Sequence, residues 1–99
     1  MFVPVALAAD FDVPEFTMNS GIVVGKAIGC KLDGARIMKA TKTAFATIDV
    51  MGKTAKERDD ATRVFGSSTR LGETYIKQNG TAHYRTIDQS LDVIINLGR

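Results

Sequence analysis

Cys30 and His83 are the residues of this chain whose side chains could act as a nucleophile and a base. Lys26 and Lys31 lie close to Cys30 in sequence, and neighbouring cations lower the pKa of a thiol, which favours the reactive thiolate. A nucleophilic cysteine also needs an oriented base, and nothing beside His83 would orient its ring. We therefore favour a buried Cys30 and a surface position for His83. A thiol-dependent enzyme or redox sensor that uses Cys30 stays as an alternative.

The spacing of the other chemistry-bearing residues fits no metal or phosphate motif. His83, the single histidine, has no cysteine or carboxylate at the spacing of metal ligands. Gly21, Gly25 and Gly29 recur every four residues, which matches neither a dinucleotide-binding fingerprint nor a phosphate-binding loop. The sequence therefore predicts no cofactor, no metal and no catalytic residue.

Charged residues of both signs are mixed along the chain. Thirteen Lys and Arg against eleven Asp and Glu give a formal net charge of +2, which does not by itself imply a nucleic-acid partner. A basic stripe is nevertheless conceivable along the two central helices, from Lys39, Lys42, Lys53, Lys56, Arg58, Arg63 and Arg70. Acidic residues interrupt it, so nucleic acid is disfavoured as a partner and a small nucleic-acid-binding domain is kept as an alternative function.

Length and composition indicate one small folded domain. A chain of 99 residues can build one core but not two, and 44% hydrophobic with 24% charged residues is typical of globular proteins. A single cysteine excludes an internal disulfide, so a reducing compartment such as the cytoplasm or an organelle interior is the default expectation. The apolar stretches are shorter than the roughly 20 residues of a membrane-spanning helix. We expect a soluble protein without a transmembrane segment, compatible with peripheral association with a membrane complex.

Residues 1–18 are predicted to form an extended N-terminal arm. Pro4 and Pro14 interrupt helical periodicity, and β-favouring residues lie between them. Such an apolar arm is expected to dock on a protein partner. Its predicted partner-binding residues are Phe2, Val3, Val5, Phe11, Val13 and Phe16. Residues 6–8 also match the small-x-small pattern of a signal-peptide cleavage site, so a remnant of a targeting peptide is the alternative.

Residues 19–99 are predicted to form a single, mainly α-helical domain of three to four short helices. Ser20 is a favourable N-cap for a first helix at residues 21–31, and a strand at residues 22–30 is the alternative. On this helix Gly21, Gly25 and Gly29 would form a smooth stripe that another backbone can approach closely. We assign these three glycines, together with the arm, to partner binding.

The central part of the chain carries clear helix boundaries. Apolar residues follow the 3.6-residue period from about residue 33 to residue 51, and Gly52 is suited to end that helix. Thr54 and Glu57 make a capping box that begins a third helix. Gly66 is expected to end this third helix and to be followed by a short polar loop.

The segment at residues 73–86 fits two structures. Asn79 and Gly80 are a strong signal for a two-residue hairpin turn, which would make the fold α+β. The same pair can end a helix that contains Tyr75, which we favour because the rest of the chain is helical. A terminal helix is expected after a capping box at Thr86 and Gln89. Its predicted buried face is Ile87, Leu91, Ile94 and Ile95.

These observations favour interaction over catalysis. We expect a noncatalytic structural or accessory subunit of a larger multiprotein assembly, which docks through its N-terminal arm and the glycine-striped segment.

Overall fold

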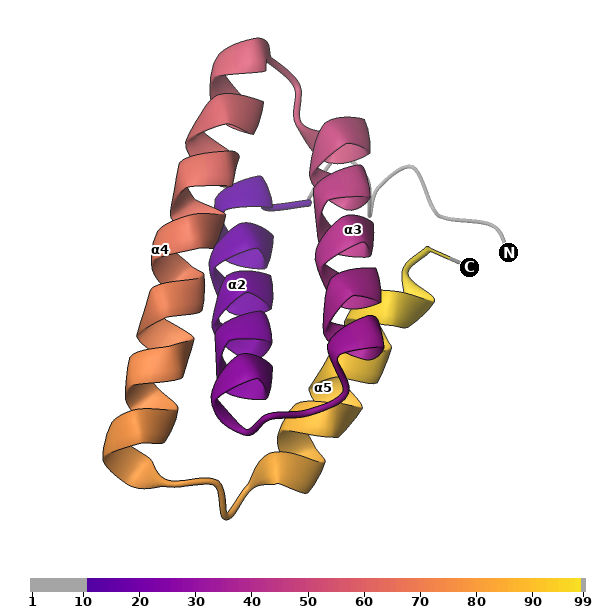
Figure 1. Ribbon diagram of the computed structural model, residues 1–99. Coiled ribbons are helices and arrows are strands. Elements are labelled where there is room, and N and C mark those ends of the chain that lie inside the picture. Colours follow the sequence, from indigo (N-terminus) through magenta and orange to yellow (C-terminus); the bar gives the residue numbers. More distant parts are fainter. Residues whose placement is uncertain (1–10, 99) are drawn as a thin grey trace.

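The computed structural model describes residues 11–98, which contain four helices and no strand. The helices are α2 (Val13–Gly29), α3 (Gly34–Met51), α4 (Ala55–Asn79) and α5 (Tyr84–Asn96). Figure 1 shows α2, α3 and α4 standing side by side, with α5 crossing obliquely at the lower end of α3. The predicted mainly α fold is confirmed. The hairpin at residues 73–86 is not formed, because residues 73–79 belong to α4 and residues 84–86 to α5. The strand at residues 22–30 is not formed either, because α2 runs through residue 29.

Helix α2 begins earlier than predicted and includes the second half of the predicted arm. The Asp12 carboxylate caps it by accepting a hydrogen bond from the backbone N–H of Glu15 at 2.9 Å. Pro14 lies in the first turn, where its missing N–H costs no helical hydrogen bond. An extended conformation is therefore wrong for residues 13–18, and the predicted boundary at residue 18 falls inside a helix. The first part of the predicted arm, including Phe2, Val3 and Val5, lies outside the described residues.

Glycines bring the backbones of α2 and α4 into direct contact. A Cβ added at Gly25 would lie 1.9 Å from the carbonyl oxygen of Thr69, and one added at Gly72 would lie 2.3 Å from the carbonyl oxygen of Ile22. Any side chain at these positions would push the two helices apart. The close backbone approach predicted for the glycine stripe is thus present, and the approaching backbone belongs to the same chain.

Helix α4 is one continuous helix of 25 residues, so the predicted end at Gly66 and the predicted loop after it are wrong. The hydroxyls of Ser67 and Thr69 donate to the carbonyl oxygens of Val64 at 3.1 Å and Phe65 at 2.9 Å, which satisfies them within the helix. The N-cap prediction is confirmed, since Thr54 Oγ1 accepts from the N–H of Glu57 at 3.0 Å. Gly80 ends α4 with a φ of 84°, in the left-handed region that favours glycine.

The core lies between α5 and the facing sides of α2, α3 and α4. Leu91 and its neighbours on α5 pack against the small residues Ala40 and Ala44 of α3. The ring of Phe45 packs on that of Phe65 at a tilt of 46°, with ring centroids 4.8 Å apart. The predicted buried face of the last helix is confirmed, with Ile87, Leu91, Ile94 and Ile95 all buried. Its start is not, because α5 begins at Tyr84 and the Thr86 side chain makes no cap.

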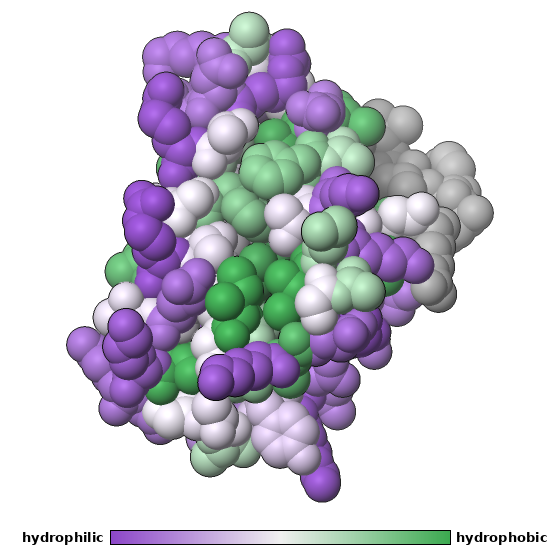
Figure 2. Space-filling view, in the orientation of Figure 1, coloured by the Kyte–Doolittle hydropathy of each residue, from purple (hydrophilic) through white to green (hydrophobic). Residues whose placement is uncertain are grey.

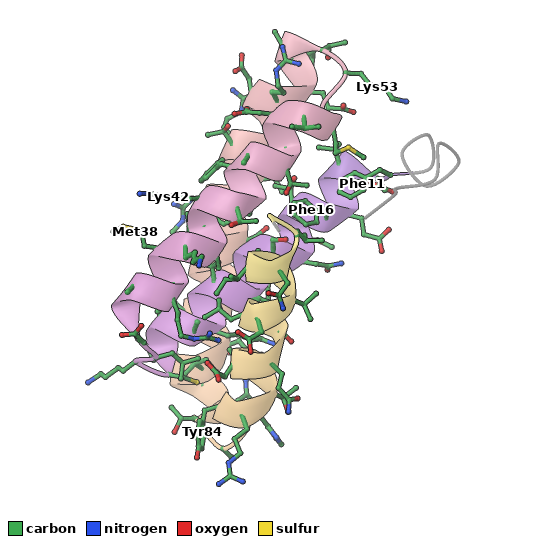
Figure 3. The ribbon with its side chains drawn as sticks, turned by 90° about the vertical axis from the view of Figure 1, so that its right-hand side faces the viewer. Phe11, Phe16, Met38, Lys42, Lys53 and Tyr84 are labelled. Carbon is green, nitrogen blue, oxygen red and sulfur yellow. The ribbon has the colours of Figure 1, made fainter. Side chains whose placement is uncertain are left out.

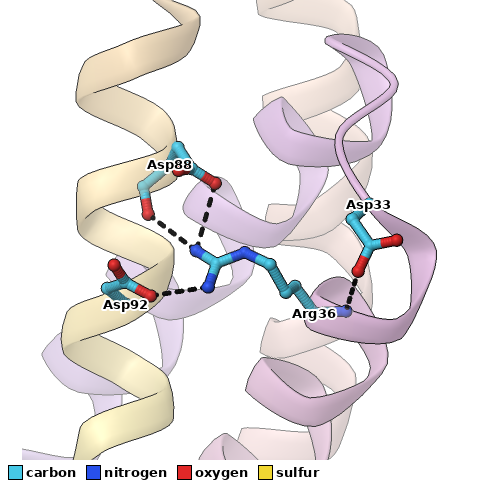
Figure 4. A network of polar contacts seen from close by, with 4 residues as sticks. All are labelled: Asp33, Arg36, Asp88 and Asp92. Atoms are coloured by element: carbon cyan, nitrogen blue, oxygen red, sulfur yellow. Dashed lines mark hydrogen bonds and ion pairs between the residues drawn. The ribbon is translucent and has the colours of Figure 1, made fainter.

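A charged contact at the rim of the core joins α3 to α5. The Arg36 guanidinium donates to Asp92 Oδ1 at 2.7 Å and to Asp88 Oδ1 at 3.0 Å (Figure 4). Asp33, the N-cap of α3, accepts from the backbone N–H of Arg36 at 3.2 Å, so the turn that begins α3 also positions this side chain. The hydrogen bond with Asp92 is the main cause of the raised pKa of Arg36.

Candidate functional site

Cys30 is the C-cap residue of α2 and His83 is the N-cap residue of α5. Cys30 is half-buried at the C-terminal end of α2, where its backbone N–H donates to Lys26 O at 2.9 Å. His83 is exposed, immediately before α5, and no hydrogen bond joins it to Cys30. Within residues 11–98, no group of three or more His, Cys, Asp or Glu side chains is placed to hold a metal ion.

The predicted basic stripe is interrupted in the folded chain. Lys56 donates to Asp60 at 2.8 Å, and Arg63 pairs with the same carboxylate. Arg58 instead donates to the carbonyl oxygen of Gly52 at 2.9 Å. These cations are therefore engaged near the start of α4 and do not extend a continuous positive surface from the lysines of α3. The hydrogen bond from Lys56, together with Arg63, lowers the pKa of Asp60.

Most of the predicted partner-binding residues that the structure describes face the interior. Val13 is buried, and Phe16 is half-buried and packs on Phe11 with the rings tilted by 51° and their centroids 5.3 Å apart. Gly21 and Gly25 are buried under α4. A Cβ added at the third glycine, Gly29, would lie 2.8 Å from Ile76 Cβ, so it too faces α4. The assignment of the glycine stripe to an outside partner is therefore wrong, because α4 already covers it.

Phe11 is the exception, because it opens onto an apolar groove between α3 and the end of α5. The groove has a volume of about 670 Å³. Its lining residues are Phe11, Lys42, Thr43, Ala46, Thr47, Val50, Met51, Leu97 and Gly98. Val50 is 80% exposed and Leu97 is 51% exposed, so two large apolar side chains stand open to solvent at its edges. In Figure 3 this side of the molecule faces the viewer, with Phe11 and Phe16 beside the end of α5.

The hydroxyl groups in the groove are turned into the helix that carries them. Thr43 Oγ1 donates to Lys39 O at 2.9 Å, and Thr47 Oγ1 donates to Thr43 O at 2.8 Å. The charged side chain in the lining is that of Lys42. The lining therefore offers apolar contact and a cation at one edge rather than a converging set of polar groups.

Of the lining residues, the sequence assigned only Phe11 to partner binding and placed Lys42 in a basic stripe, because the walls come from segments about 50 residues apart in sequence. The sequence carried one indication of the groove, because Val50 is an apolar residue that does not lie on the buried face of its helix. A second face, in the view of Figure 2, gathers apolar side chains between the columns of α4 and α3. The groove at Phe11 is the stronger candidate, because the large apolar side chains of Val50 and Leu97 stand exposed there.

Among residues 11–98, no helix combines the length and the apolar character needed to cross a bilayer. Comparison of the chain with protein-family models, with curated proteins and with solved structures finds no match.

Proposed function

We propose that this chain is a noncatalytic structural or accessory subunit of a larger protein assembly, and that it docks through the groove between α3 and α5. The observation that carries the proposal is the exposure of Val50 and Leu97 at the edges of an apolar hollow of about 670 Å³. Contiguous exposed apolar surface on a small protein is typical of interaction sites, because covering it removes unfavourable contact with water.

The chemistry of the lining favours a protein side chain over a polar small molecule. Small-molecule sites combine apolar walls with a few placed polar groups that fix the ligand. Here the hydroxyls of Thr43 and Thr47 already donate to carbonyl oxygens of α3. Lys42 alone offers a charge, at a position where it can pair with a carboxylate beside an apolar contact. An apolar protein surface with a neighbouring acidic residue fits this lining.

The sequence that precedes Phe11 is apolar. Residues 2–9 carry no charged side chain, and they lead to Phe11, which lines the groove. We assign them to the docking surface together with the groove. This assignment keeps Phe2, Val3 and Val5 as partner-binding residues and replaces the glycine stripe by Val50 and Leu97.

The test is affinity purification of the tagged chain from the cells that produce it, with the same substitution at two exposed valines. Val50→Asp places a charge at the edge of the groove, and Val93→Asp places one at a site on α5 that is 65% exposed and does not line the groove. We expect Val50→Asp to reduce recovery of the partner at least about tenfold, the equivalent of about 1.4 kcal/mol. Val93→Asp should leave recovery unchanged. Equal recovery with both variants would remove the groove from the proposal.

A shortened chain tests the N-terminal residues separately. A chain that begins at Asp10 keeps Asp12, the cap of α2, and both buried residues of its first turns, Val13 and Thr17. We expect it to fold and to recover less partner than the full chain. Undiminished recovery would restrict the docking surface to the groove.

A further inference from the structure

Helix α3 has one face in the core and one face entirely open. Ala40, Ala44 and Ile48 form the buried face. Residues three, four or seven apart share a face of a helix. On the opposite side such spacings produce a stripe of exposed residues, called here the α3 stripe: Ala35, Met38, Lys42, Ala46 and Asp49. Figure 3 shows Met38 and Lys42 projecting from the same side of α3.

The α3 stripe carries two opposite charges that have no partner among the described residues. Neither Lys42 nor Asp49 forms an ion pair or a side-chain hydrogen bond within residues 11–98, whereas Arg36, Asp60 and Asp92 all do. Lys42 and Asp49 are seven residues apart, which separates them by about 10 Å along the helix. The stripe therefore presents a cation and an anion two helical turns apart, with the small residue Ala46 between them.

The positions of these charges make the stripe complementary to itself. Lys42 lies as far before the midpoint between Phe45 and Ala46 as Asp49 lies after it. If a second copy packs its α3 antiparallel across this midpoint, Lys42 of each copy faces the Asp49 of the partner subunit. A two-fold axis makes both pairs at once, because the same patch is used on both sides. A parallel arrangement would instead place like charges opposite each other.

The neighbouring side chains suit such a contact. Ala46 lies at the crossing point, where a small residue allows two helices to approach to the 8–10 Å of ordinary helix packing. Met38, 59% exposed, and Val50, 80% exposed, flank the crossing and supply apolar area. We propose that a second copy of this chain docks on the α3 stripe, forming an antiparallel homodimer. This inference rests on the proposed function, because the α3 stripe shares Lys42 and Ala46 with the groove. It assigns a second copy of the chain as the partner that covers this side of α3.

The charges of Lys42 and Asp49 act mainly by determining that the two α3 helices pack antiparallel rather than parallel. Exposed ion pairs add little affinity, whereas like charges placed opposite each other disfavour an arrangement. Screening by salt reduces both effects. The dimer should therefore weaken as the salt concentration rises, and reversing one charge should disrupt it.

Sedimentation equilibrium of the full chain with charge-reversal variants tests the proposal. Lys42→Asp leaves two acidic residues on the α3 stripe, and Asp49→Lys leaves two basic ones, so each variant alone repels its own copy. In an equal mixture of the two variants every acidic position faces a basic one, and the double variant K42D/D49K restores both pairs within one sequence. Lys77→Asp and Asp59→Lys make the same charge changes at exposed positions on α4.

We expect wild type and both α4 controls to dimerise, each single α3 variant to dimerise at least tenfold more weakly, and the mixture and the double variant to recover. Recovery in the mixture also demonstrates that each single variant is folded. A wild type that stays monomeric up to millimolar concentration, or single variants that dimerise like wild type, would overturn the inference. If the wild type is monomeric but Val50→Asp still abolishes recovery of the partner, only the dimer is refuted. If the wild type dimerises but Val50→Asp does not change recovery of the partner, only the proposed function is refuted.

Discussion

At the scale of single residues, Asp60 forms ion pairs with two residues of the predicted basic stripe, Lys56 and Arg63. Its carboxylate accepts from Lys56 at 2.8 Å and pairs with Arg63, and both cations lie on the same helix. The hydrogen bond from Lys56 is the main cause of its lowered pKa. Because the pKa is lower in the folded than in the unfolded chain, the stabilisation is present above the unfolded value and is lost as the pH falls through the folded one.

Replacing this carboxylate should therefore alter the acid side of the stability profile. We expect Asp60→Asn to lower the free energy of unfolding slightly at pH 7 and to lose less stability than wild type between about pH 4 and pH 2. Urea unfolding at several pH values, followed by circular dichroism, measures how the free energy of unfolding of each protein changes with pH. Asp59→Asn is the matched control, since Asp59 is exposed and forms no ion pair among the described residues. Parallel acid slopes for wild type and Asp60→Asn would contradict the pairing.

At the scale of elements, the two glycines inside α4 have opposite surroundings. A Cβ added at Gly66 meets nothing within 4 Å, whereas one added at Gly72 would lie 2.3 Å from Ile22 O on α2. Alanine in a helix interior is favoured over glycine by about 0.5–1 kcal/mol. We expect Gly66→Ala to raise the free energy of unfolding by about that amount, and Gly72→Ala to lower it by more than 1 kcal/mol, roughly. Urea midpoints distinguish these outcomes, and a destabilising Gly66→Ala would argue against a continuous α4.

At the scale of the whole molecule, the buried residues form two clusters that share neighbours. One cluster surrounds Leu91 and the other surrounds Val13 and Ile48, and Phe16 and Phe45 pack against both. A common set of contacts predicts that all four helices unfold together. The described residues measure 39 × 29 × 21 Å.

Leu91→Ala tests this coupling, because its side chain is fully buried beside α2 and α3. Removing three buried carbons should lower the free energy of unfolding by about 2–5 kcal/mol. The loss should appear in one transition, seen at the same urea concentration by far-ultraviolet circular dichroism and by tyrosine fluorescence, since Tyr75 is on α4 and Tyr84 is on α5. Two separate transitions would show that α4 and α5 belong to different folding units.

The sequence by itself determined the features that depend on near neighbours. Asp33, Gly52 and the Thr54–Glu57 pair define helix ends through contacts within four residues, and the buried face of α5 follows from its apolar period. Packing decided the rest. Gly66 remains helical because the helix around it packs on α2, Pro14 begins a helix because Asp12 caps it, and the glycine stripe meets α4 rather than a partner. The groove could not be predicted, because α3 and the end of α5 meet only when the core between them forms.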